Sequence, residues 1–106
     1  MKIESKSNLK ENVKNVDYDI NYGTIKAGSD TKVVIKITEV SHFSVTKSCG
    51  CTMPIIEILP EGGFNLIINY DNQKVGVINQ AVWERVVDEN NNQKLITFNL
   101  KGTIIQ

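Results

Sequence analysis

Apolar and polar residues alternate along most of the chain from residue 17 onward. In the segment 32–38, Val33, Ile35 and Ile37 fall on one face, and Lys32, Lys36 and Thr38 fall on the other. The same period of two recurs later, with apolar residues at Phe64, Leu66, Ile68 and Tyr70, at Val75, Val77, Ala81 and Trp83, and at Ile96, Phe98, Leu100 and Ile104. Because successive side chains of a strand point to opposite faces, this period is typical of half-buried β-strands.

Turn-forming residues separate these segments, at 27–30, 60–63, 71–73 and 88–92. No helix of normal length is expected after residue 16. Short strands at this spacing predict an all-β fold, an Ig-like β-sandwich of about seven strands over residues 17–106.

Residues 1–16 differ from the rest, because they are polar and contain few apolar side chains. Such a segment is typical of a disordered tail. We favour instead an N-terminal arm that docks on a neighbouring subunit. Its apolar residues Leu9, Val13 and Val16 are the predicted interaction residues.

Composition limits the classes of partner. The 106 residues carry 12 basic and 12 acidic side chains, so there is no net basic charge with which to neutralise nucleic-acid phosphates. No apolar run approaches the roughly 20 residues of a membrane helix, and the first residues lack the apolar core of a secretory signal. We therefore expect no nucleic acid and no membrane insertion. We also expect a protein that stays in the cytoplasm where it is made, unless a signal has been removed.

Both cysteines lie in one short motif, Ser48-Cys49-Gly50-Cys51-Thr52-Met53-Pro54. In an extended strand the two Cα atoms would be roughly 6.5–7 Å apart, at the limit for a disulfide, and Gly50 allows a tighter turn. The alternatives are a buried structural corner, which we favour, a disulfide without catalytic duty, a metal site and a redox pair. A metal site would need His42, the single histidine, together with Cys49 and Cys51, and this spacing matches no zinc module that we can name.

The remaining candidates point away from catalysis. Trp83 is predicted to be a core residue packed between the sheets, Glu84 and Arg85 to lie at a strand end, and His42 to lie in a loop or at a strand edge. No nucleophile–base pair, phosphate loop or dinucleotide fingerprint occurs in the sequence. We expect no enzymatic activity and no cofactor.

Several of these motifs, in this order, resemble a bacterial family of short Ig-like domains of unknown function, number fifteen seventy-three. The resemblance lies in Tyr22 to Gly28, in the Ser-Cys-Gly-Cys-Thr-x-Pro signature with Cys49, Gly50, Cys51 and Pro54, in the turn and strand from Leu59 to Asp71, and in Leu100 to Ile104. The segment between the second predicted strand and the signature is shorter here than in the family. The resemblance implies an Ig-like sandwich without established activity. Members of the family are typically exported or lipid-anchored, and the absence of an export signal in this sequence is a second departure from the family.

Three functions follow as hypotheses. The first is a non-enzymatic auxiliary, or decoration, protein on a bacteriophage virion, with capsid or other virion proteins as partners. The second is an adhesion or scaffold module of the bacterial cell envelope. The third is a thiol or metal-binding protein that uses the Cys-Gly-Cys motif.

Overall fold

A computed structural model of the chain describes residues 2–5 and 16–106. Eight strands occur in this part of the chain, and no helix does. They are β1 (Lys2–Ser5), β2 (Val16–Lys26), β3 (Val33–Thr38), β4 (Ser41–Lys47), β5 (Thr52–Ile58), β6 (Phe64–Tyr70), β7 (Gly76–Val87) and β8 (Gln93–Ile105). The described residues therefore offer no helix long and apolar enough to cross a membrane.

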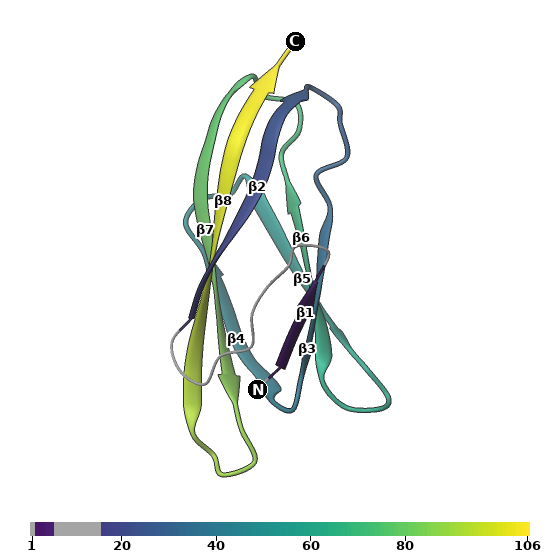
Figure 1. Ribbon diagram of the computed structural model, residues 1–106, viewed down its shortest axis with the longest axis vertical. Helices are drawn as coiled ribbons and strands as arrows, with labels where there is room; N and C mark the ends of the chain where they lie inside the picture. Colours follow the sequence, from purple (N-terminus) through teal and green to yellow (C-terminus); the bar gives the residue numbers. More distant parts are fainter. Residues whose placement is uncertain (1, 6–15) are drawn as a thin grey trace.

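The strands form two four-stranded sheets that face each other (Figure 1). One sheet has the order β1-β3-β6-β5, and the other has the order β2-β8-β7-β4. In immunoglobulin lettering these orders are A-B-E-D and, after an additional first strand, G-F-C, which is the arrangement of a constant-type Ig domain. The additional strand β2 runs parallel to β8, whereas the other strand pairs are antiparallel. The predicted Ig-like β-sandwich is thus confirmed.

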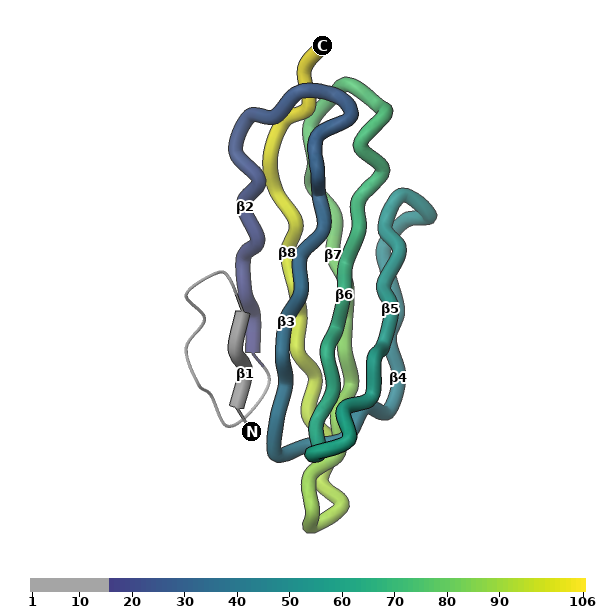
Figure 2. The backbone as a smooth tube through the Cα atoms, turned by 90° about the vertical axis from the view of Figure 1, so that its right-hand side faces the viewer, coloured from purple at the N-terminus to yellow at the C-terminus, as the bar shows by residue number. Residues whose placement is uncertain are grey.

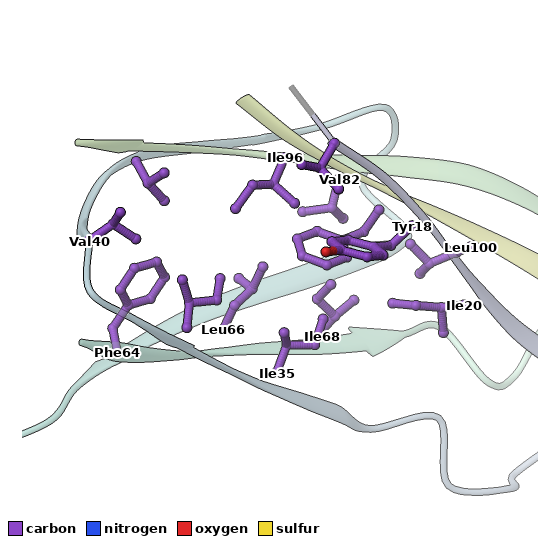
Figure 3. Close-up of a cluster of buried hydrophobic side chains, with 14 of the residues drawn as sticks. Tyr18, Ile20, Ile35, Val40, Phe64, Leu66, Ile68, Val82, Ile96 and Leu100 are labelled. Carbon is purple, nitrogen blue, oxygen red and sulfur yellow. The ribbon is translucent and has the colours of Figure 1, made fainter. Parts of the chain in front are cut away.

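The core lies between the two sheets (Figure 3). Its fully buried side chains include Ile35 and Ile37 of β3, and Val82 of β7. β6 and β8 supply the inward-facing residues predicted from their alternation: Phe64, Leu66, Ile68, Ile96, Phe98, Leu100 and Ile104. This packing is the main favourable contribution to folding, since each such side chain gains about 1.5–3 kcal/mol on burial.

The N-terminal boundary differs from the prediction. Residues 2–5 pair with β3 of the same chain, so this part of the predicted arm joins the sandwich. Val16 is the first residue of β2 and pairs with Ile96. The sandwich therefore includes residues on both sides of the predicted boundary between residues 16 and 17.

Among the described residues, the β2–β3, β3–β4, β4–β5 and β6–β7 connections join the two sheets, whereas β7 and β8 belong to the same sheet. The β4–β5 connection, residues 48–51, passes from one sheet to the other at the upper ends of β4 and β5, below the top of the molecule (Figure 2). The β7–β8 hairpin, residues 88–92, projects beyond the other strands at the lower end (Figure 1).

Candidate functional site

The cysteine motif forms a compact turn between β4 and β5. Cys49 and Cys51 are joined by a disulfide bond, and their Cα atoms are 5.3 Å apart. This distance is shorter than an extended strand gives, because the chain turns at Gly50 and Cys51. Both cysteines are only partly buried, so the buried structural corner that we favoured is wrong. The disulfide alternative is the one that the structure contains.

Hydrogen bonds tie this turn to both sheets. The backbone N–H of Ser48 donates to the carbonyl oxygen of Ala81 in β7 at 2.9 Å, and the N–H of Ala81 donates to Ser48 Oγ at 2.8 Å. On the other side, the N–H of Asp71 donates to the carbonyl oxygen of Cys51 at 2.7 Å. The motif therefore fastens the edge strands β4 and β5 to the neighbouring strands β7 and β6.

Pro54 lies in β5, opposite Ile68 of β6. Since β5 is the last strand of its sheet, a residue without a backbone N–H is tolerated there on the open side. A proline in an edge strand also removes one donor to which another chain would pair. We therefore assign Pro54 a structural role.

The proposed metal ligands do not come together. His42 lies near the start of β4, whereas Cys49 and Cys51 follow the end of that strand. Both sulfur atoms are bonded to each other, so neither is available as a thiolate ligand. Among the described residues, no group of three or more His, Cys, Asp or Glu side chains is placed to hold a metal ion. A metal site or free thiols at these residues are therefore contradicted, whereas a redox role of the Cys49–Cys51 pair stays a prediction.

His42, which is partly exposed, instead pairs with the buried Glu84. Its Nδ1 atom lies 2.7 Å from Glu84 Oε2, and the Glu84 side chain is fully buried. A β-bulge between His42 and Ser44 makes this contact possible, because it turns His42 towards the core while Phe43 points to solvent. His42 also contacts the ring of Phe64 edge-on, with ring centroids 5.6 Å apart. The prediction that His42 lies at a strand edge is confirmed, since β4 is the last strand of its sheet.

Burial sets the protonation of this pair. It raises the pKa of Glu84 to about 8 and lowers the pKa of His42, because the charged form of each group loses hydration. Glu84 Oε1 is buried and has no hydrogen-bond partner among the described residues. At neutral pH the two side chains therefore share one proton, which lies between Glu84 Oε2 and His42 Nδ1.

The pairing of His42 with Glu84 was not predicted from the sequence. Glu84 was expected at a strand end, but it lies inside β7 and points into the core between Val82 and Val86. The only signal in the sequence is the spacing of Glu84, which lies two residues from both Val82 and Val86 and therefore shares their face of the strand. The partner of such a residue is set by the bulge in β4, which the sequence pattern does not reveal.

Trp83 lies on the opposite face from the one predicted. It is partly exposed on the outer face of β7, next to Thr97 of β8 and Thr46 of β4 in the strand register. Val77, on the same outer face, is 76% exposed. The core role predicted for Trp83 is therefore wrong.

The predicted interaction residues have different outcomes. Val16 is 5% exposed and packs in the core of its own chain, so the prediction that it contacts a neighbouring subunit is wrong. Leu9 and Val13 lie outside the described residues.

Seven large apolar side chains are strongly exposed among the described residues, and five of them lie in two groups. Met53 and Ile55 lie on the outer face of β5, where Ile55 pairs with the partly exposed Ile67 of β6. The second group is at the opposite sheet, where β7 begins and β8 ends, and consists of Val75, Val77 and Ile105. The other two are Phe43 of the bulge and Ile58, which lies opposite Phe64 at the end of β5 and so on the other face of that strand.

A hollow of about 470 Å³ lies where the β3–β4, β5–β6 and β7–β8 connections meet. Its charged residues are Lys36, Glu39, Glu61, Asp88 and Glu89. It contains no histidine or cysteine, and no serine–histidine or cysteine–histidine pair faces it. We assign no chemistry to it.

No family model and no curated protein matches the sequence. The resemblance to the family of unknown function therefore stays a prediction. Among solved structures, the BIgI domain of beta protein from S. agalactiae, determined bound to CEACAM1, is similar over 99% of this chain and 100% of that chain, with 14% sequence identity and a TM-score of 0.44.

Proposed function

We propose that this protein is a non-enzymatic interaction module, an Ig-like structural part of a larger protein assembly. The observation that carries the proposal is the pair of exposed apolar groups on β5 and on the β7–β8 end of the sandwich. Single exposed apolar residues are common on protein surfaces, but clusters of them favour contact with another protein.

The disulfide favours a place outside the reducing cytoplasm, because disulfides persist on cell and virion surfaces and are rare in cytosolic proteins. The finer proposal is an auxiliary protein on the surface of a bacteriophage virion, made in the host cytoplasm and bound to capsid or other virion proteins. The alternative is an adhesion or scaffold module of the bacterial cell envelope. The disulfide supports both locations equally, and the resemblance to exported Ig-like domains supports the second.

Fractionation of the source culture separates these locations. Virus particles, cell envelopes and cytosol are probed with an antibody raised against the purified protein. A signal that bands with the particles supports the virion, and a signal in the envelope supports the alternative. A monomeric protein found only in the cytosolic fraction would contradict the proposed assembly.

Surface variants test the interaction itself. Met53→Lys with Ile55→Lys places two charges on the β5 group without touching the core, since both side chains are more than half exposed. We expect this variant to fold and to be lost from the assembly at least tenfold. Asn90→Lys, in the exposed β7–β8 turn, is the matched control and should be retained.

A further inference from the structure

The outer face of the β2-β8-β7-β4 sheet carries a regular arrangement of side chains around Trp83. The strand register places Asp17 of β2, Thr97 of β8, Trp83 of β7 and Thr46 of β4 in one row across the sheet. The next row towards the β7–β8 hairpin contains Arg85, and the next row in the other direction contains Asp19. We call this surface the tryptophan face.

Asp17 and Arg85 lie apart on the tryptophan face. Asp17 and Asp19 are exposed on β2, at one edge of the sheet, and Arg85 is on β7, two strands away. With strands about 4.8 Å apart and about 3.3 Å per residue, Asp17 and Arg85 are roughly 12 Å apart. No ion pair joins these two side chains in the described part of the chain.

The charged groups have weak partners within the described part of the chain. Asp17 has no ion-pair partner there, and Asp19 has only a 4.0 Å contact with the exposed Lys101. Arg85 Nη1 is 3.5 Å from Gln93 Oε1, at the outer limit of a hydrogen bond. As far as the described part of the chain is concerned, both signs of charge are therefore available to another molecule.

We propose that the tryptophan face binds a second copy of this chain, related to the first by a two-fold axis. Asp17 of each copy then faces Arg85 of the other, which gives two equivalent ion pairs from one contact. Such a two-fold axis lies in the plane of the interface and exchanges the positions of Asp17 and Arg85. It passes next to Trp83, because Trp83 shares a row with Asp17 and a strand with Arg85. The two tryptophans therefore pack against each other at the centre.

This arrangement matches the composition of stable protein interfaces. Tryptophan and arginine are the residues most enriched among those that dominate binding, and they lie near the centre of the contact. The chain has 12 basic and 12 acidic residues, so two copies approach without net repulsion. The inference rests on the proposed function, since it identifies one partner of the interaction module as another copy of the same chain.

Sedimentation velocity of the purified full chain over a range of concentrations tests the proposal. We expect a monomer–dimer equilibrium. Arg85→Asp and Asp17→Arg should each raise the dissociation constant at least tenfold, because each places two like charges opposite one another. The double variant with both substitutions should restore the dimer, because the ion pairs are re-formed with exchanged signs. Circular dichroism confirms that each variant is folded.

Lys36→Asp is the matched control. Lys36 lies on β3, on the outer face of the other sheet, so reversing its charge should leave the dimer intact. A monomer at every concentration, or a double variant as weak as the single variants, would overturn the proposal. If the monomer is nevertheless retained in the larger assembly, the proposed function stands and only the second copy is wrong as its partner.

Discussion

Glu84 is the residue whose surroundings differ most from what its side chain requires. A carboxylate inside a sandwich core loses its hydration, and only one of its two oxygens has a partner among the described residues. The hydrogen bond to His42 makes this position tolerable, because the pair needs only one proton to avoid a buried net charge. The stability of the fold should therefore depend on pH through this pair.

We expect the free energy of unfolding to fall as the pH rises from 6.5 to 8. In the unfolded chain, Glu84 and His42 have pKa values near 4.5 and 6.5, so both are deprotonated above pH 6.5. The folded pair keeps its proton up to about pH 8, because burial raises the pKa of Glu84. The folded state thus binds more protons in this window, and stability decreases by on the order of 2 kcal/mol.

Urea denaturation at pH 6 and at pH 8.5 measures this difference. In Glu84→Gln the loss between the two pH values should disappear, because an amide does not titrate. Equal stability of the original protein at both pH values would contradict the role of the pair.

The disulfide gives a second prediction at the scale of single residues. It closes a loop with a sequence separation of 2, and such a short loop removes little entropy from the unfolded chain. The loop-closure relation gives about 1.6 kcal/mol. Replacing both cysteines by serine should lower the free energy of unfolding by about that amount.

A reductant provides the control for the disulfide. It should shift the denaturation midpoint of the original protein to that of the serine variant, and it should leave the variant itself unchanged. A midpoint of the original protein that does not respond to reductant would exclude a stabilising disulfide.

Single-residue roles followed from the sequence only where local chemistry determines them. The Cys-Gly-Cys spacing limited the cysteines to a few alternatives, and the disulfide was among them. The fates of Val16 and Glu84 depended on strands distant in sequence, β8 for the first and β4 for the second. Periodicity within one segment carries no information about such partners.

At the scale of elements, alternation identified the buried face where only one face is apolar. β6 and β8 have polar residues at most of their outward positions, and their inward residues were predicted correctly. β7 has apolar residues on both faces, and its inward face also carries Gln80 and Glu84. The face with Val77 and Trp83 was therefore the more apolar one in the sequence, and it is the outer face in the structure.

The turn between β5 and β6 gives a prediction at this scale, because two adjacent glycines there have different surroundings. Gly62 and Gly63 both have a positive φ, +100° and +77°. A Cβ atom at Gly62 would meet nothing within 4 Å, whereas a Cβ at Gly63 would lie 2.5 Å from the backbone oxygen of Ile37. The turn can pass this close to the end of β3 only because position 63 has no side chain.

Gly62→Ala should therefore cost about 1–3 kcal/mol of stability, from backbone strain alone. Gly63→Ala should cost more, because the backbone of β3 has to move as well. Thermal or urea denaturation of the two variants measures the difference. An equal loss in both variants would show that the approach of Gly63 to β3 is unimportant.

At the scale of the whole molecule, the sandwich was predictable because its turns and most of its strands carry local signals. The order of strands within each sheet depends on long-range pairing, and the parallel contact of β2 with β8 was not expected. The N-terminal boundary was misplaced for the same reason, since Val16 completes the core only through its position beside Ile96.

Two truncated chains test where the sandwich begins. Deletion of residues 1–15 and deletion of residues 1–16 differ only in Val16, which is 5% exposed. The longer deletion should be less stable by about 2 kcal/mol, the value for burying one valine. Identical denaturation midpoints would mean that Val16 contributes nothing to the fold.

The parallel pairing of β2 with β8 also determines how the module responds to mechanical force. In sequence order, β2 and β8 are the first and last strands of the β2-β8-β7-β4 sheet, and they run in the same direction over most of their length (Figure 1). Pulling on the start of β2 and on the end of β8 loads their shared hydrogen bonds in shear, so that these bonds have to break together rather than one after another. A sandwich held at the start of β2 and pulled at the end of β8 would therefore keep this pair of strands together under loads that peel apart an antiparallel hairpin.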